Sequence, residues 1–143
     1  MTIAVDFDGT IVTHAYPAIG KPIPFAIDTL KKLQQEDHHN IVLWTCRTGQ
    51  LLQDAIDYCT SRGLEFYAVN AMYPEEREED RFARKLDADL FIDDRNLGGI
   101  PDWGVIYRMI HSGNPFTPEV DAYDAPETNK PKSKSGLLSK LFS

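Results

Sequence analysis

Two carboxylates follow the first apolar segment of the chain, at a spacing that places both in one loop. The segment TIAVDFDGT brings Asp6 and Asp8 directly after residues typical of a buried strand. Two carboxylates this close repel each other, which raises a pKa or calls for a bound cation. An isolated DxDG sequence also fits an ordinary turn, because Asp and Gly are turn formers. The other polar residues of the chain distinguish between a cation site and an ordinary turn.

Polar side chains also follow two later apolar segments. NIVLWT ends in Thr45, which precedes Cys46 and Arg47, and DLFI is followed by Asp93 and Asp94. The carboxyl ends of strands in an open parallel sheet share one crevice, so we expect these groups to converge there. Acids gathered at one edge favour a hard cation with oxygen ligands. Mg²⁺ fits best, because it binds through one or two carboxylates, water and substrate phosphate.

The elements that would position these groups alternate along the chain. TIAVDF, NIVLWT and DLFIDD are nearly continuous apolar runs, as expected of parallel strands covered on both faces, and LEFYAV is a weaker fourth. Two apolar stripes at helical spacing lie between them: Ala26, Ile27, Leu30 and Leu33, then Leu51, Leu52, Ala55, Ile56 and Cys59. The alternation predicts an α/β protein with a doubly wound, mainly parallel sheet. Residues 104–110 fit either a last strand or a last helix.

Composition and charge limit the class of protein. The chain has 143 residues, 42% hydrophobic and 26% charged, which suits one soluble domain. It contains no apolar stretch near the roughly 20 residues that span a bilayer. Two cysteines without metal-binding spacing and no apparent secretory signal indicate a cytoplasmic protein. The formal net charge is −7, and residues 126–143, with four lysines and one glutamate, contribute +3 of it. Residues 1–125 therefore carry a net charge of −10, which argues against general nucleic-acid binding.

The composition also suggests boundaries. Residues 1–113 form the predicted core, in which residues 11–23, rich in Pro and Gly, make a loop that overhangs the crevice and brings His14 and Tyr16 within reach of a substrate. Residues 114–143 are rich in Pro, Ser and Lys, and we expect a flexible tail. Its last residues, LLSKLFS, offer a contact for a partner.

Taken together and in order, DFDGT, LWTCRTG and RFARKLDADLFIDD resemble the motifs of haloacid dehalogenase-superfamily phosphohydrolases over about residues 1–112. The resemblance implies a Rossmann-like, three-layer sandwich. Only one loop and one helix separate Asp8 from Thr45, and no inserted domain fits before Lys85, so the chain resembles the branch without a cap domain.

The resemblance also implies roles for individual residues. Asp6 becomes the nucleophile that forms an aspartyl phosphate, and Asp8 the general acid and base. Thr45 and Lys85 complete the catalytic set by binding phosphoryl oxygens. The implied metal ligands are Asp6, Asp8 through its backbone carbonyl, Asp93 and Asp94.

Several assignments stay open at this stage. Arg81 and Arg84 compete with Lys85 for the basic role, and a helix over this segment would put Arg81 and Lys85 on one face. Cys46 joins the substrate-binding set with Thr45, Arg47 and Lys85, but its thiol is interpreted as structural, because the arginine of a cysteine-phosphatase loop is replaced by Leu52. Arg47 suits either a substrate anion or a nearby acid.

The sequence thus predicts a Mg²⁺-dependent phosphatase acting on a phosphorylated small molecule or macromolecular end of unknown identity. Two alternatives are a receiver-like module that only accepts phosphate and a non-catalytic Mg²⁺-binding module acting through a partner. In a receiver the accepting aspartate ends a middle strand, and here that strand ends in Thr45.

Overall fold

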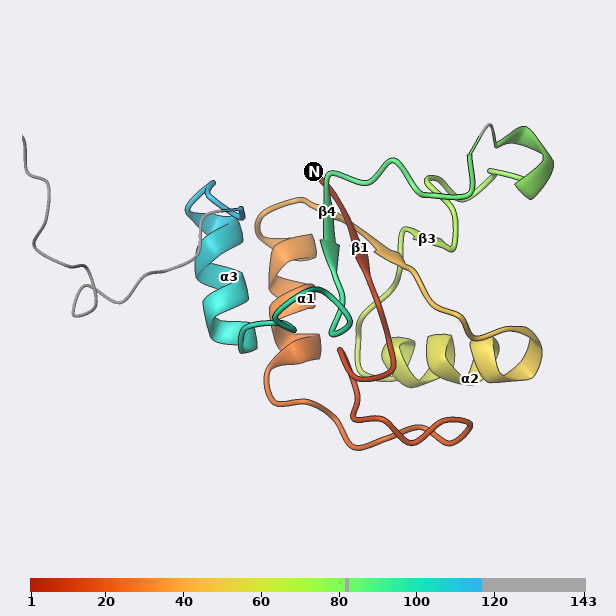
Figure 1. Cartoon of the computed structure of the whole chain (residues 1–143), viewed down its shortest axis with the longest axis horizontal. Coiled ribbons are helices and arrows are strands. Elements are labelled where there is room, and N and C mark those ends of the chain that lie inside the picture. The colour runs from red at the N-terminus through yellow and green to blue at the C-terminus, as the bar shows by residue number, and fades with distance from the viewer. Residues whose placement is uncertain (82, 117–143) are drawn as a thin grey trace, which may run out of the picture.

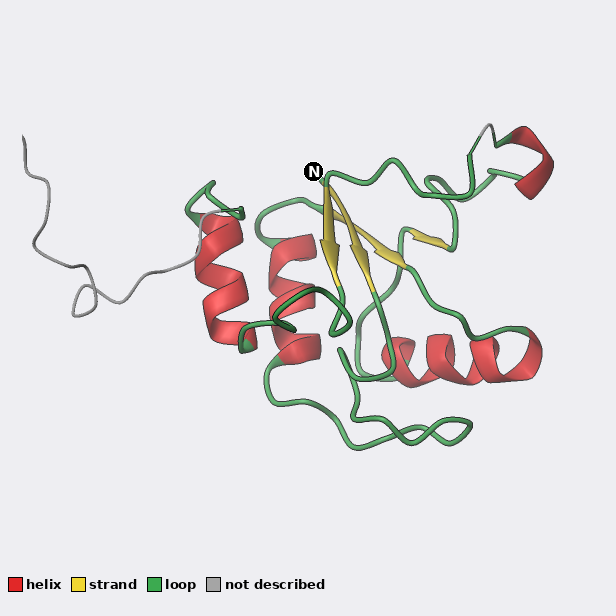
Figure 2. Ribbon diagram, in the orientation of Figure 1, coloured by secondary structure: helices red, strands yellow, loops and turns green. Residues whose placement is uncertain are grey.

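Four parallel strands form one sheet flanked by helices. A computed structural model of the chain describes residues 1–81 and 83–116. In chain order the elements are β1 (Thr2–Val5), α1 (Ala26–Gln35), β2 (Asn40–Leu43), α2 (Gly49–Thr60), β3 (Ala68–Val69), the 3-10 helix η1 (Glu78–Asp80), β4 (Leu90–Ile92) and α3 (Trp103–His111). The strands lie side by side in the order β3-β2-β1-β4 (Figures 1 and 2). The predicted α/β, Rossmann-like fold is confirmed.

The strand order reverses direction at β1. The chain runs from β1 to β2 and on to β3, then crosses to the other side of β1 to form β4. In open α/β sheets such a reversal opens a crevice at the carboxyl ends of the strands. Figure 1 shows the loop of residues 11–23 at this end of the sheet, toward which the strand arrows point.

The two faces of the sheet are covered differently. One face packs against all three α-helices in a core that includes Ile3, Val5, Leu30, Leu43, Ala55, Cys59, Ile92, Trp103 and Ile106. The other face, with Ala4 and Val42, is covered by the connection between β3 and β4, which contributes Ala71, Met72, Leu86 and Ala88. In its described residues, the second covering layer is therefore an irregular segment with one short 3-10 helix.

Several local expectations were settled. The helices expected from the stripes at 26–33 and 51–59 are α1 and α2, and residues 104–110 belong to a helix, α3. The fourth strand is shorter than LEFYAV, since β3 covers only Ala68–Val69. The helix that would put Arg81 and Lys85 on one face is not found in the described part of this segment, where η1 ends at Asp80.

Two expectations concern the ends and environment of the chain. From residue 117 onward the predicted tail lies outside the described residues. Among the helices that the structure describes, none has both the length and the apolar character needed to cross a membrane.

Between Asp8 and Thr45 the chain, described throughout, forms only the loop, α1 and β2, without an inserted domain.

The helix α3 is tied to the loop after β1. Asp102 caps it, because its carboxylate accepts hydrogen bonds from the backbone N–H groups of Gly104 (2.8 Å) and Val105 (3.0 Å). The next residue, Trp103, is fully buried and donates its indole N–H to the carbonyl oxygen of Thr10 at 3.1 Å. This bond fixes the turn that follows Asp8.

We predict that Trp103→Phe lowers the free energy of unfolding by about 1–3 kcal/mol, because it leaves the buried carbonyl of Thr10 without this donor. Urea unfolding followed by circular dichroism measures the change. The matched control is Trp44→Phe, which changes a half-buried tryptophan on the opposite face of the sheet. Equal losses in the two variants would contradict the assigned role of the indole hydrogen bond.

Candidate functional site

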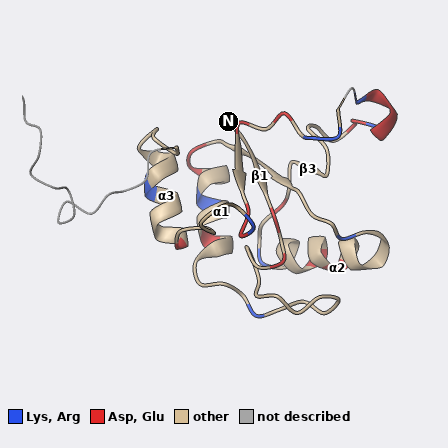
Figure 3. Cartoon of the chain, in the orientation of Figure 1, with Lys and Arg blue, Asp and Glu red and all other residues tan. Residues whose placement is uncertain are grey.

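Pairing between β1 and β4 brings the acids of two distant motifs together. Val5 is opposite Ile92, and the backbone N–H of Asp6 donates to the carbonyl of Ile92 at 3.0 Å. Asp6 and Asp93 are the next residues of the two strands, so they leave the sheet side by side. One carboxylate oxygen from each of Asp6, Asp93 and Asp94 lies within 4.8 Å of the others. Figure 3 shows acidic positions at these strand ends.

The electrostatics of this group centre on Asp6. Burial raises the pKa of its carboxyl to about 6, and the negative charges of Asp93, Asp94 and Asp8 act in the same direction. A hydrogen bond from the backbone N–H of Phe7 acts in the opposite direction but does not cancel these effects. The charged neighbours that shift this pKa are thus all acids. A cation bound among these oxygens would reduce the repulsion between the carboxylates.

Asp94 is held by two residues of the loop after β1. The hydroxyl of Thr10, which is fully buried, donates to its carboxylate at 3.4 Å and accepts from its backbone N–H at 3.1 Å. The ring nitrogen Nε2 of His14 lies 2.8 Å from the other carboxylate oxygen. A Cβ at Gly9, where φ is +86°, would lie 2.2 Å from His14 Nε2 and 2.5 Å from that oxygen, so this close approach requires glycine.

Sequence reasoning found only part of this support. It placed His14 near a substrate rather than against an acid, and it did not single out Thr10. The available signal was the Thr that directly follows DFDG, since a small hydroxyl residue there can bond groups on a neighbouring strand end.

Thr45 lies two residues beyond β2, which ends at Leu43 rather than at Thr45 as the sequence predicted, and two hydrogen bonds hold it in place. Its backbone N–H donates to the side-chain oxygen of Asn70 at 2.9 Å. Its hydroxyl oxygen accepts from the backbone N–H of Arg47 at 3.2 Å, and this bond does not use the hydroxyl hydrogen. Cys46 is exposed, and the interpretation of its thiol as structural stays a prediction. The buried cysteine is Cys59, where burial raises the pKa to about 12.

Arg47 does not point toward an open substrate pocket. Its side chain is 1% exposed, and its Nε and Nη2 donate to the two carboxylate oxygens of Asp8, both at 2.7 Å. The sequence had offered a substrate anion or a nearby acid as its partner, and the structure places the acid there. The carboxylate of Asp8 is therefore turned to Arg47 and is not part of the three-aspartate group.

The predicted basic residue does not join the acids in this structure. The ammonium of Lys85 lies 5.5 Å from the centre of the Phe91 ring. Arg81 is engaged with Glu76 at 2.9 Å and with the carbonyl of Asn70. Arg84 is exposed. The roles assigned to this segment remain predictions.

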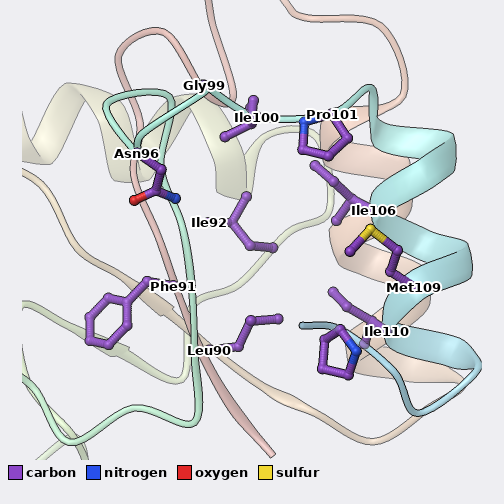
Figure 4. A pocket seen from close by; sticks show the side chains of 11 residues that line it. Leu90, Phe91, Ile92, Asn96, Gly99, Ile100, Pro101, Ile106, Met109 and Ile110 are labelled. Atoms are coloured by element: carbon purple, nitrogen blue, oxygen red, sulfur yellow. The ribbon is translucent and has the colours of Figure 1, made fainter. Parts of the chain in front are cut away.

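An apolar cavity of about 160 Å³ lies beside the acidic group but is separate from it. It is enclosed by β4, α3 and the loop between them (Figure 4), and its lining includes Ile92, Ile100, Ile106, Met109 and Ile110. Its lining includes none of the aspartates. The cavity therefore lies between β4 and α3 and is not part of the three-aspartate group.

Fold and site together define a parallel α/β protein with three aspartates at the point where strand order reverses. A conserved protein from Bacteroides thetaiotaomicron, whose structure has been solved, is 65% identical to this chain, with a TM-score of 0.74. The match covers 79% of this chain and 91% of that one, so the chain belongs to the family of that protein. No family model matches the sequence, and no curated protein matches it.

The raised pKa of Asp6 predicts a pH dependence of stability. The folded protein binds this proton up to about pH 6, whereas the unfolded chain loses it near the ordinary value of 3.8. The unfolding free energy should therefore fall as pH rises from about 4 to about 6, and stay lowered above that. Asp6→Asn should remove this fall and be more stable than wild type at pH 7.5 with EDTA present.

Urea unfolding at pH 4.5 and 7.5 measures both quantities. Asp57→Asn, at an exposed position of α2, is the control and should keep the wild-type pH dependence. The assignment fails if Asp6→Asn and wild type lose the same stability over this range.

Proposed function

We propose that the protein is a Mg²⁺-dependent phosphohydrolase that cleaves a phosphate monoester through an aspartyl phosphate on Asp6. The observation that carries the proposal is the group of Asp6, Asp93 and Asp94, whose oxygens lie within 4.8 Å of one another. The group lies at the carboxyl ends of neighbouring parallel strands, at the reversal of strand order, where α/β proteins bind ligands. The resemblance to capless haloacid dehalogenase-type phosphohydrolases supports the same conclusion.

The residues fit a magnesium ion. All donors are carboxylate oxygens, which Mg²⁺ prefers. A cation would also offset the burial and the charge repulsion that together raise the pKa of Asp6. Asp6, Asp93 and Asp94 would hold the ion, with Thr10 fixing the orientation of Asp94. When bound, Mg²⁺ supplies positive charge that screens the carboxylate nucleophile from the anionic phosphate.

The chain's own groups then divide the reaction into two steps. A carboxylate oxygen of Asp6 bonds to phosphorus while the ester P–O bond breaks. The leaving oxygen takes a proton from Asp8, which must first carry that proton on one of the two oxygens that accept from Arg47. A water molecule next attacks the phosphorus of the aspartyl phosphate and gives its proton to Asp8. The bond to Asp6 breaks, phosphate leaves, and both carboxyl groups return to their initial state.

The phosphoryl oxygens need donors as charge shifts among them. The proposed donors after β2 are the hydroxyl of Thr45 and the backbone N–H of Cys46. Lys85 is the proposed basic group, which requires its ammonium to leave the ring of Phe91. The substrate is a phosphate monoester on a small molecule or on a macromolecular end, since no inserted domain covers the site.

A second candidate is favoured by two observations. Arg47 occupies both carboxylate oxygens of Asp8, and Lys85 lies against Phe91, an arrangement that also suits a module that binds Mg²⁺ or accepts phosphate without turnover. Lasting labelling by acetyl phosphate without release of phosphate would favour this candidate over the hydrolase.

We predict that the protein releases p-nitrophenol from p-nitrophenyl phosphate in Mg²⁺, and that Asp6→Asn lowers kcat at least about 1,000-fold by removing the nucleophile. EDTA should abolish the wild-type rate, and added Mg²⁺ should restore it. Asp57→Asn serves as the control and should keep the wild-type rate. A rate that survives in Asp6→Asn would refute the aspartyl phosphate.

We also predict that Thr10→Val weakens Mg²⁺ binding about 10- to 100-fold, because valine has the shape of threonine but cannot hold Asp94. Isothermal titration with Mg²⁺ measures the affinity. Thr60→Val, an exposed substitution at the end of α2, should bind like wild type. Equal affinities in the two variants would show that the Thr10 hydroxyl does not organise the metal ligands.

A further inference from the structure

Arg47 joins two parts of the site that are otherwise separate. Besides its two bonds to Asp8, its Nη1 donates to the carbonyl of Pro17 at 3.1 Å and its Nη2 to the carbonyl of Ala18 at 2.8 Å. The guanidinium carbon also lies 5.3 Å from the centre of the Tyr16 ring. One side chain from the end of β2 therefore fixes both Asp8 and residues 16–18 of the overhanging loop.

The environment of Arg47 makes this arrangement costly to change. A buried guanidinium is tolerated only when its charge is paired and its N–H groups have acceptors. Asp8 provides the charge through a two-pronged contact, which is the strong geometry for an Arg–carboxylate pair. The two loop carbonyls take most of the remaining donors, and the ring of Phe7 lies 5.1 Å from the guanidinium carbon.

We infer that Arg47 is a positioning residue that assembles the leaving-group side of the site by fixing Asp8 and the loop of residues 11–23 as one unit. This inference rests on the proposed function, in which Asp8 gives its proton to the leaving oxygen. Whatever is attached to that oxygen lies next to Asp8, and through Arg47 next to residues 16–18. The loop thus contacts the alcohol part of the substrate, and its exposed Tyr16 ring is the surface nearest to Arg47.

Two other roles for Arg47 make different predictions. If Arg47 bound the substrate phosphate, its loss would raise KM for every phosphate ester. If it only stabilised the fold, its loss would lower the rate equally for every ester. A positioning role acts through Asp8, so its loss harms most the esters whose leaving oxygen needs a proton.

The decisive variant is Arg47→Lys, which keeps a positive charge but loses the planar fork. The probes are p-nitrophenyl phosphate, whose leaving group departs readily without a proton, and phenyl phosphate, which has a similar shape and a poorer leaving group. With Mg²⁺ saturating, kcat for phenyl phosphate should fall about 100-fold or more, which is the usual contribution of a positioned acid. The fall for p-nitrophenyl phosphate should be much smaller, with KM for both near wild type.

Arg62→Lys is the matched control, because Arg62 also lies over an aromatic ring, that of Tyr58 at 3.6 Å, at the far end of α2. It should leave both rates unchanged. Equal falls for the two esters in Arg47→Lys, or a rise of KM with unchanged kcat, would overturn the inference.

A second measurement uses the wild-type protein and needs no turnover. In ¹H–¹⁵N spectra the Nε–H of Arg47 should exchange with water far more slowly than that of Arg62, and Asp8→Asn should shift its signal. Fast exchange like that of Arg62 would overturn the inference. If wild type hydrolyses neither ester, the proposed function fails, while this spectrum still decides whether Arg47 fixes Asp8 and the loop.

Discussion

The parallel pairing of β1 with β4 is the constraint on which the site depends. The register that puts Val5 opposite Ile92 also fixes Asp6 and Asp93 as neighbours, with the N–H of Asp6 bound to the carbonyl of Ile92. The strands are held in this register by a core on one face and the β3–β4 connection on the other. The register therefore keeps Asp6 and Asp93 side by side, and the pKa of Asp6 is raised first by its burial and further by the negative charges of Asp93, Asp94 and Asp8.

Sequence reasoning succeeded where chemistry and periodicity agreed. Apolar runs ending in acids predicted the strands and the convergence of Asp6 with Asp93 and Asp94, because parallel strands share one carboxyl edge. It failed over residues 81–87, where charged residues suit a helix surface or an irregular segment equally well. There Leu86 and Ala88 are placed by packing on the sheet, and no local preference reveals that. The partner of Arg47 was equally hidden, since 39 residues separate it from Asp8.

The two acids of DFDGT are used differently although they are two residues apart. Asp6 continues β1 and faces the other acids, while the turn at Gly9 and Thr10 directs Asp8 to the side of Arg47 and the overhanging loop. Trp103 and Thr10 hold this turn to α3 and to Asp94. The hydrogen bonds of Trp103 and Thr10 and the ion pair of Asp8 with Arg47 therefore place the carboxylates of Asp6 and Asp8 in different surroundings.

The three-aspartate group and the Arg47 side of the site also differ in the elements that build them. The sheet register keeps Asp6 beside Asp93, while Thr10 and His14 orient the carboxylate of Asp94. By contrast, the carbonyls of Pro17 and Ala18 and the exposed ring of Tyr16 belong to a loop, and Arg47 joins them to the segment after β2. In the proposed hydrolase, substitutions of Tyr16 that keep the carbonyls of Pro17 and Ala18 in place would change the contact with the alcohol part of the substrate, while Arg47 still holds Asp8.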